Sequence, residues 1–244
     1  MLNYILFFLV IAIANIIQGI TGFAGTILAM PFSLILVGYP VAKPVLNVLA
    51  ILSGGYVFLG NRDKVDKKVL LQVIVIMLIG IFAGIWIKDL FLGHEKALYL
   101  ALGIFIILLS LEGFWELFLR KTPQSEHVSP LTYALLPLAG LVHGIFVSGG
   151  PLLIGFMSKK LPDRHAFRAT ISTVWIILNT IILVDDIRAG YWDSRLLITF
   201  LISIPFLFIG MRIGSRLYAK MNQRTFMIIT YILLFISGLT LLFK

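Results

Sequence analysis

Two glycine-rich breaks interrupt the apolar runs of this chain, and they read Gln18-Gly19-Ile20-Thr21-Gly22-Phe23-Ala24-Gly25 and His143-Gly144-Ile145-Phe146-Val147-Ser148-Gly149-Gly150-Pro151. Each break combines glycines with amide, hydroxyl or imidazole side chains between two apolar segments. Backbone of this kind is tolerated at membrane depth only where it is buried in protein or lines a wet cavity. The breaks therefore indicate discontinuous helices in a membrane protein.

The composition of the whole chain fits a membrane protein. Of its 244 residues, 60% are hydrophobic and 13% are charged, which is about half the charged fraction of a soluble domain. A helix needs about 20 apolar residues to cross the hydrocarbon core. The chain can therefore cross a membrane many times and leaves no sizeable soluble domain. It contains no cysteine, which excludes a thiolate metal site and a cysteine nucleophile.

The apolar stretches form two sets of five. They cover residues 3–19, 24–38, 44–60, 69–92 and 96–119, and then residues 131–146, 150–158, 166–187, 195–213 and 225–243. The second member of each set is short for a full crossing, and we interpret it as a half-helix or a tilted helix after the break. The pattern predicts an all-α polytopic membrane protein in which eight to ten segments cross.

The two sets also resemble one another. A shift of about 125 residues places Gln18-Gly19 on His143-Gly144 and Ala24-Gly25 on Gly149-Gly150, and such duplication is typical of transporter scaffolds. We predict a first membrane repeat over residues 1–120, a short cytoplasmic linker over 121–130 and a second repeat over 131–244.

Basic residues divide unequally between the two sides if the crossings alternate. One side collects Arg62, Lys64, Lys67, Lys68, Arg120, Lys121, Lys159, Lys160, Arg164, Arg168, Arg212, Arg216, Lys220 and Arg224. The other side receives Lys43, Lys88, Lys96, Arg188, Arg195 and Lys244. Because cytoplasmic loops are enriched in Lys and Arg, the first side is predicted to be cytoplasmic and both termini extracytoplasmic. Each half has an odd number of crossings, whether or not its short segment crosses fully, so the two repeats are predicted to be inverted relative to one another. Inverted repeats with broken helices place a binding site near the midplane, at the interface between the repeats.

The breaks supply most of the candidate binding residues. Half-helices that begin near Ala24 and Gly150 would present N–H groups and positive dipole ends to an anion. The candidates are Gln18, Thr21, Gly22, Ala24, Gly25, Thr26, His143, Ser148, Gly149, Gly150 and Pro151, with Asn47, Ser172, Thr173 and Asn179 on the runs that follow. The alternatives are close helix packing for the glycines and interhelical hydrogen bonds for the polar side chains.

The duplicated breaks resemble the glycine-rich signature of the sulfite exporter TauE/SafE family, and the resemblance covers essentially the whole chain. It implies an inner-membrane permease for a small anion such as sulfite, a sulfonate or an organic carboxylate. The chain departs from a perfect duplication in one respect, because the first break has Ala24-Gly25 where the second has Gly149-Gly150.

Charged and titratable residues in apolar runs are further candidates. Glu112 and His143 are candidates for proton coupling; the alternatives are an ion-pair ladder of Glu112 with Glu116 and Arg120, and a neutral, hydrogen-bonded His143. Arg168 and Arg212 are candidates for attracting the anion, with snorkelling as the alternative. The acidic residues Asp185, Asp186 and Asp193 are assigned to an outer loop.

The sequence thus predicts a secondary transporter for sulfite, thiosulfate, a sulfonate or a short carboxylate, in a bacterial or archaeal inner membrane. An anion channel and a non-transporting membrane scaffold are the alternatives. Enzyme motifs such as His-Glu-x-x-His, Gly-x-Ser-x-Gly and the phosphate loop do not occur. Energy would come from a gradient of H⁺ or Na⁺, without a metal or organic cofactor. The expected partners are the anion and the bilayer, not nucleic acid, and homo-oligomerisation is left open. The basic cytoplasmic side favours export slightly over uptake.

Overall fold

The computed structural model describes all residues except 23, 91–94, 119–129, 162, 219–222 and 243–244. The described chain consists of α-helices joined by short connections, with one 3₁₀ turn and no strand. The helices are α1 (Leu2–Thr21), α2 (Gly25–Val37), α3 (Tyr39–Leu59), α4 (Lys67–Leu90), α5 (Glu95–Phe118), α6 (Pro130–Phe146), α7 (Gly150–Lys160), α8 (Arg164–Arg188), α9 (Ser194–Tyr218) and α10 (Gln223–Leu242), and the 3₁₀ turn is η1 (Arg62–Lys64). Each predicted apolar stretch corresponds to one helix, while the predicted linker lies almost entirely outside the described residues.

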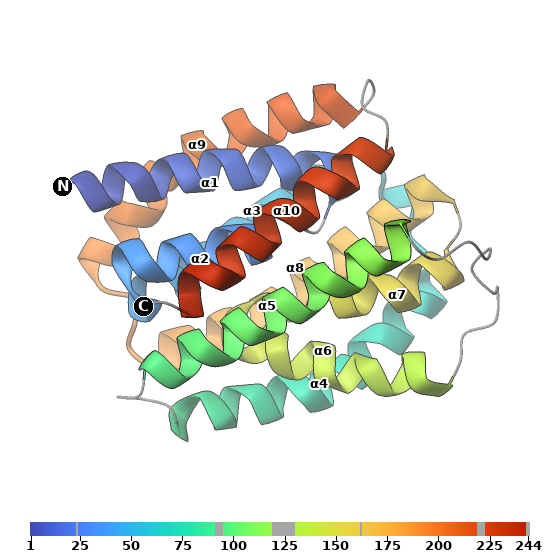
Figure 1. The fold of residues 1–244 in the computed structure, drawn as a ribbon, viewed down its shortest axis with the longest axis horizontal. Helices are drawn as coiled ribbons and strands as arrows, with labels where there is room; N and C mark the ends of the chain where they lie inside the picture. Colours follow the sequence, from blue (N-terminus) through green and yellow to red (C-terminus); the bar gives the residue numbers. More distant parts are fainter. Residues whose placement is uncertain (23, 91–94, 119–129, 162, 219–222, 243–244) are drawn as a thin grey trace.

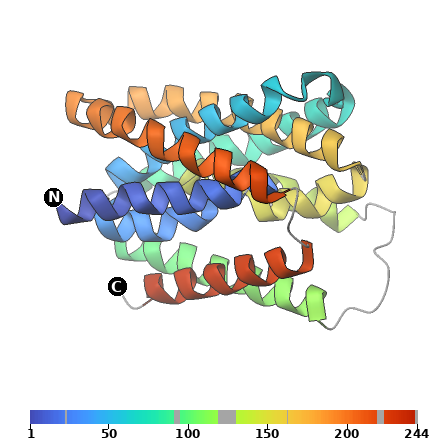
Figure 2. The same ribbon diagram turned by 90° about the horizontal axis from the view of Figure 1, so that it is seen from above.

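Successive helices run back and forth along one axis, so the bundle has two ends (Figure 1). Both chain termini lie at one of them, which we call the terminal end, and η1 lies at the other, which we call the loop end. The most extensive helix contacts join α1 with α9, α4 with α6, α5 with α10 and α3 with α8. Viewed from above, α5 and α10 form one face of the bundle (Figure 2).

Among the described residues, five helices are long and apolar enough to cross a membrane. They contain the spans Leu2–Ile20, Tyr39–Leu59, Lys67–Lys88, His165–Arg188 and Ser194–Leu217. Shorter apolar helices include Gly25–Val37, Leu100–Trp115 and Tyr133–Phe146. With 13 and 11 residues, α2 and α7 rise only about 20 and 16 Å at 1.5 Å per residue. Neither can cross the hydrocarbon core alone.

The helix surfaces match a lipid environment. On α4, the exposed large side chains are Leu71, Val75, Ile79, Phe82 and Trp86, which share one helical face. The opposite face, including Val73, Met77 and Ile81, is buried and α4 packs on α6. Exposing one such side chain to water costs about 1.5–3 kcal/mol relative to burial, so this stripe is stable only against lipid or another apolar surface.

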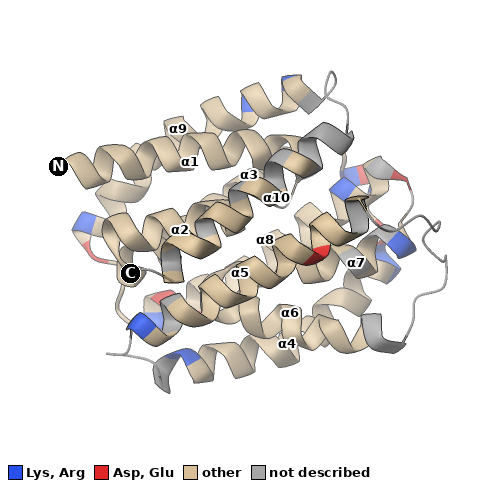
Figure 3. Cartoon of the chain, viewed as in Figure 1, with Lys and Arg blue, Asp and Glu red and all other residues tan. Residues whose placement is uncertain are grey.

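Charged residues lie mainly toward the two ends of the bundle (Figure 3). The assignment of Asp185 and Asp186 to an outer loop is wrong, because both belong to the last turns of α8, and the Asp186 side chain is fully buried. Lys43 and Lys88, which the sequence analysis assigned to the extracytoplasmic side, are also buried, inside α3 and α4. Opposite charges in contact compensate one another, which allows these groups to leave water. Asp193 does lie in the α8–α9 connection, where it accepts the Leu196 N–H at 2.7 Å.

Glycines allow the closest helix contacts. A Cβ atom on Gly19 of α1 would lie 2.8 Å from the Met211 carbonyl oxygen of α9, and one on Gly144 of α6 would lie 2.7 Å from the Ile81 carbonyl oxygen of α4. Neither distance leaves room for a side chain. The packing interpretation therefore holds for Gly19 and Gly144, which directly follow the polar residues Gln18 and His143.

Candidate functional site

The first break is held together by the side chain of Gln18. Helix α1 ends at Thr21, and Gly22 follows with φ 83°, a left-handed conformation that glycine adopts without strain. The Gly22 N–H closes the helix on the Gln18 carbonyl oxygen at 2.7 Å. The Gln18 side chain then accepts the Gly25 N–H at 2.8 Å through Oε1 and donates from Nε2 to the Gly22 carbonyl oxygen at 3.2 Å. One amide thereby joins the end of α1 to the start of α2.

The second break has the same design, with His143 in place of Gln18. Helix α6 ends at Phe146, and Val147 follows with φ 55°, its N–H donating to the His143 carbonyl oxygen at 2.7 Å. A positive φ at a β-branched residue costs on the order of 1–3 kcal/mol and clusters at functional sites. The Gly149 N–H, at the start of α7, donates to His143 Nδ1 at 3.4 Å. Gln18 and His143 each lie four residues before the left-handed residue.

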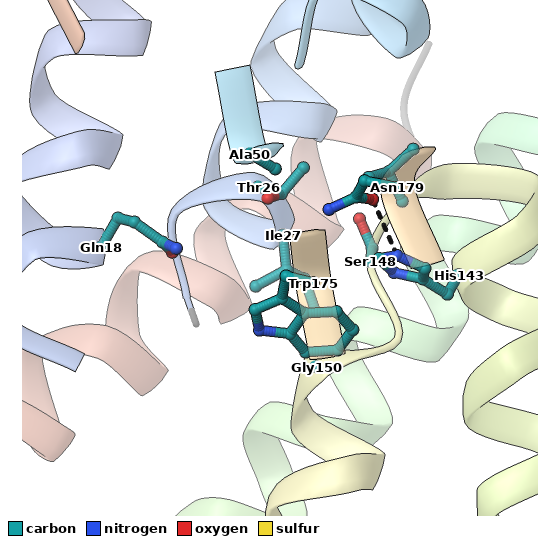
Figure 4. Close-up of a pocket in the computed structure, with 10 residues that line it drawn as sticks. Gln18, Thr26, Ile27, Ala50, His143, Ser148, Gly150, Trp175 and Asn179 are labelled. Atoms are coloured by element: carbon teal, nitrogen blue, oxygen red, sulfur yellow. Dashed lines mark hydrogen bonds between the residues drawn. The ribbon is translucent and has the colours of Figure 1, made fainter. Parts of the chain in front are cut away.

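The two breaks meet at one small cavity (Figure 4). Its lining consists of Gln18, Thr26, Ile27, Ala50, His143, Val147, Ser148, Gly150, Trp175 and Asn179. A second cavity shares Gln18, Thr26 and Ala50 and is completed by Asn15, Gly25, Ala29, Leu46, Leu49 and Ser53. Each has room for about one water molecule.

Two hydrogen bonds at this cavity orient the Asn179 amide. Because Gly149 N–H donates to His143 Nδ1, the imidazole carries its proton on Nε2 and donates to Asn179 Oδ1 at 2.9 Å. With its oxygen engaged, Asn179 directs its amide nitrogen toward Thr26 (Figure 4). Asn179 Nδ2 and Trp175 Nε1 are both buried without a hydrogen-bond partner in the described structure. Since no acidic side chain is among the described residues that line the cavity, its chemistry suits an anion.

Comparison with known proteins identifies the family. The family model described as "Sulfite exporter TauE/SafE" matches residues 7–241. This chain belongs to the sulfite exporter TauE/SafE family. It is also similar to a protein of Comamonas testosteroni named "Probable inner membrane transporter protein TsaS", with 26% identity over 184 residues that cover 74% of each chain. No solved structure matches.

The predicted family is therefore confirmed, and the chain is a multi-pass membrane transporter. The family match extends across both breaks and nearly all the helices described above. The match specifies neither the substrate nor the mechanism of transport.

In this TauE/SafE protein, each break is also fixed from the opposite half of the chain. Arg168 of α8 donates from Nη2 to the Gly19 carbonyl oxygen at 2.8 Å, near the end of α1. Tyr39 of α3 donates its hydroxyl to the Ile145 carbonyl oxygen, near the end of α6. The Arg168 side chain is half-buried, and its hydrogen bond satisfies a carbonyl group near the end of α1. Snorkelling to the interface does not account for this contact, and Arg168 does not line the main cavity.

Several predicted residues belong to the breaks without lining the main cavity. Gly25 lines the second cavity, Ala24 and Gly149 are the N-caps of α2 and α7, Pro151 lies in the first turn of α7, and Gly22 ends α1. The Thr21 side chain lies outside the described part of the structure.

The predicted residues of α3 and α8 have different positions. Asn47 is fully buried and donates to the Asn179 carbonyl oxygen at 3.1 Å. Ser172 is buried in the contact between α8 and Gly54 of α3, away from the cavity. Thr173 bonds within its own helix, to the Ala169 carbonyl oxygen at 2.8 Å.

Two charged candidates lie away from the cavity. Glu112 on α5 and Arg212 on α9 are both exposed, and neither lines either cavity. In the proposed ladder below Glu112, Arg120 lies outside the described residues.

The sequence analysis did not include Trp175, Ile27, Ala50 and Val147 among the candidates, and all four line the main cavity. Trp175 lies one helical turn before Asn179, so the i, i+4 rule could have placed it on the same face. Ile27 and Ala50 carry no polar atoms that would have distinguished them from other apolar residues.

Proposed function

We propose that this protein is a secondary transporter that binds a small anion between the first turns of α2 and α7. Sulfite, thiosulfate, a sulfonate or a short carboxylate is the expected class. The observation that carries the proposal is the pair of unpartnered buried donors, Asn179 Nδ2 and Trp175 Nε1, at a cavity formed by two helix breaks. Oxyanions accept N–H hydrogen bonds and are favoured at helix N-termini.

The helix contacts support two inverted repeats, over residues 1–120 and 131–244. Exchanging each helix with the one five positions later converts the α1–α9 contact into the α6–α4 contact, and it maps the α3–α8 and α5–α10 contacts onto themselves. The first half starts at the terminal end and runs to the loop end, whereas the second half runs the other way (Figure 1). Inverted repeats around broken helices are the usual basis of alternating access.

The small size of the cavity favours a carrier over a channel. An oxyanion is larger than the single water molecule for which the main cavity has room. Binding therefore requires the two repeats to move apart on one side at a time. The contacts of Arg168 with α1 and of Tyr39 with α6 join the two halves and stabilise the closed arrangement.

We further propose that the loop end faces the cytoplasm and that the terminal end faces outward. The basic residues assigned to the cytoplasmic side include Arg62 and Lys64 of η1. The name of the Comamonas relative, a probable inner membrane transporter, supports a bacterial or archaeal inner membrane.

Transport by the purified protein in liposomes tests the proposal. We expect saturable uptake and counterflow for at least one of sulfite, thiosulfate, methanesulfonate and acetate. Asn179→Asp replaces the free N–H donors by a carboxylate and should reduce uptake at least tenfold, since a hydrogen bond to a charged group contributes about 1.5–3 kcal/mol. Asn179→Leu, which removes the amide without adding a charge, should also reduce uptake.

Asn3→Asp, on the exposed first turn of α1, is the matched control and should leave uptake unchanged. Wild-type uptake by folded Asn179→Asp protein would contradict the proposed site. Fluxes that neither saturate nor show counterflow would favour the channel alternative.

A further inference from the structure

Four charged side chains from three helices form a compact cluster near the terminal end. Lys43 of α3 is paired with Asp186 of α8, and Lys88 of α4 is paired with Asp185 of α8. The Nζ atom of Lys43 also lies 3.8 Å from Asp185 Oδ2. The side chains of Lys43 and Asp186 are both 0% exposed, whereas that of Asp185 is 21% exposed. The cluster carries two positive and two negative charges and is neutral as a whole.

A row of polar side chains, which we call the polar seam, connects this cluster to the cavity. It consists of Lys43 and Asn47 on α3 and of Asn179 and Asp186 on α8. Asn47 Nδ2 donates to the Asn179 carbonyl oxygen at 3.1 Å and lies 3.4 Å from Asp186 Oδ2. Asn179 itself lines the cavity and bonds to His143.

Helical spacing aligns the polar seam with the cavity on both helices. On α3, Lys43, Asn47 and the cavity residue Ala50 follow one another at intervals of four and three. On α8, Trp175, Asn179 and Asp186 follow at intervals of four and seven. Such intervals keep residues on one helical face. Because α3 and α8 pack together, these two faces meet and form a continuous polar row from the cavity toward the terminal end.

The polar seam also contains polar atoms that the protein does not satisfy. Asn47 Oδ1 and Asn179 Nδ2 are buried without a partner in the described structure, on residues that are 0% and 1% exposed. Unpaired buried polar groups are unfavourable and therefore mark places where a ligand or water binds.

We propose that Lys43 and Asp186 form a second site, at which the transported monoanion replaces Asp186 as the partner of Lys43 while Asp186 takes up one proton. The inference rests on the proposed transport function and adds its coupling ion. The ammonium group of Lys43 stays charged; the Asp186 carboxylate gains the proton that enters with the anion. The buried charge is thus zero before and after the exchange.

Electroneutrality is the physical reason for this coupling. An anion that entered without a proton would leave a buried negative charge without compensation, which is costly in a low-dielectric interior. The charged groups that face Asp186 are Lys43 from α3, Lys88 from α4 and its neighbour Asp185. Asn47 connects Asp186 to Asn179, which in turn bonds to His143 of α6. Asp185 is partly exposed and remains with Lys88, so Asp186 is the carboxylate that loses its partner.

The test uses protein in liposomes with methanesulfonate, whose single charge does not change over the pH range used. With one proton per anion, accumulation at equilibrium should rise about tenfold for each unit of inward pH difference. An imposed membrane potential should have no effect, because the pair of ions carries no net charge. Methanesulfonate uptake that ignores the pH difference would overturn the inference but leave the transport function intact. Absence of uptake for every anion of the panel would instead contradict the proposed function.

Asp186→Asn should uncouple anion uptake from proton uptake. Lys43 then keeps its charge, with Asp185 at 3.8 Å as a remaining counter-ion, and can bind the anion without a proton. Uptake should lose its response to the pH difference and become sensitive to the membrane potential. Asp63→Asn, in the exposed turn η1, is the matched control and should retain the tenfold response. Loss of coupling in Asp63→Asn, or its retention in Asp186→Asn, would overturn the assignment.

The double variant Lys43→Met/Asp186→Asn tests whether the ion pair acts in transport or serves the structure alone. Replacing a buried pair by two neutral groups leaves no uncompensated charge, so the variant should fold. We expect monodisperse protein whose methanesulfonate uptake is reduced at least tenfold. Uptake and proton coupling equal to those of the wild type would show that the pair serves structure alone.

Discussion

Gln18 and His143 show how single side chains make a broken helix stable in a membrane. A break exposes backbone N–H and carbonyl groups that lipid cannot satisfy. Gln18 satisfies Gly25 N–H and the Gly22 carbonyl oxygen, and His143 accepts Gly149 N–H. An amide offers a donor and an acceptor together, while the imidazole uses its second nitrogen to orient Asn179. Both residues therefore stabilise a break and also line the main cavity.

Removing the Gln18 amide should destabilise the protein. Gln18→Leu leaves the Gly25 N–H buried and unsatisfied, at a cost of about 1–3 kcal/mol. In a protein of this size, each kcal/mol corresponds to about 2–4 °C in Tm. Thermal unfolding in detergent should therefore show a lower Tm.

Gln72→Leu is the matched control for this change, because the Gln72 side chain makes only a 3.5 Å contact with Tyr133 and lies outside both cavities. Its Tm should stay close to that of the wild type. Equal Tm values for the two variants would contradict the bridging role of Gln18.

At the scale of helices, glycine contacts determine how closely the two halves approach. The α1–α9 and α4–α6 pairs have the most extensive contacts, and both place glycines of one helix against the backbone of the other. In membranes, such contacts replace the hydrophobic driving force that water provides between soluble helices. Gly19 and Gly144 also directly follow Gln18 and His143, so helix packing positions the polar side chains at the breaks.

Gly144→Ala tests this packing. The added Cβ would lie 2.7 Å from the Ile81 carbonyl oxygen, and backbone cannot move away as a side chain can. Overpacking of this kind costs about 1–3 kcal/mol, which should lower the Tm in detergent.

Gly55→Ala on α3 is the control, since a Cβ there meets nothing within 4 Å. Alanine favours helix over glycine by about 0.5–1 kcal/mol, so this variant should be neutral or slightly more stable. A Gly144→Ala protein as stable as Gly55→Ala would show that the α4–α6 contact adapts to the extra atom.

For the whole molecule, the orientation in the membrane is the property that the distribution of basic residues predicts. The natural chain has no cysteine, so single cysteines report their surroundings without background. Asp63 in η1 and Ala189 after α8 are both exposed, and they lie at the loop end and the terminal end of the bundle, respectively. A membrane-impermeant maleimide should label Ala189→Cys in intact cells and Asp63→Cys only after permeabilisation. The reverse pattern would place the loop end outside and invert the predicted topology.

The amino-acid sequence by itself determined the helices, the breaks and the family. Each predicted apolar stretch corresponds to a helix. The reason is that a membrane helix needs a continuous apolar stretch long enough for the hydrocarbon core, and such a stretch is visible in the local sequence. Six predicted residues line the main cavity: Gln18, Thr26, His143, Ser148, Gly150 and Asn179. They were recognisable because polar groups within apolar runs have few explanations other than packing or function.

Only the tertiary structure decided the partners of the charged residues. Lys43 and Asp186 are 143 positions apart in the sequence, and they meet because α3 packs on α8. Near the end of an apolar run, a lysine or an aspartate is equally compatible with an aqueous loop, so topology alone assigned both to the surface. Burial of these charges depends on a compensating partner from another helix, and that information is carried by helix packing rather than by local sequence.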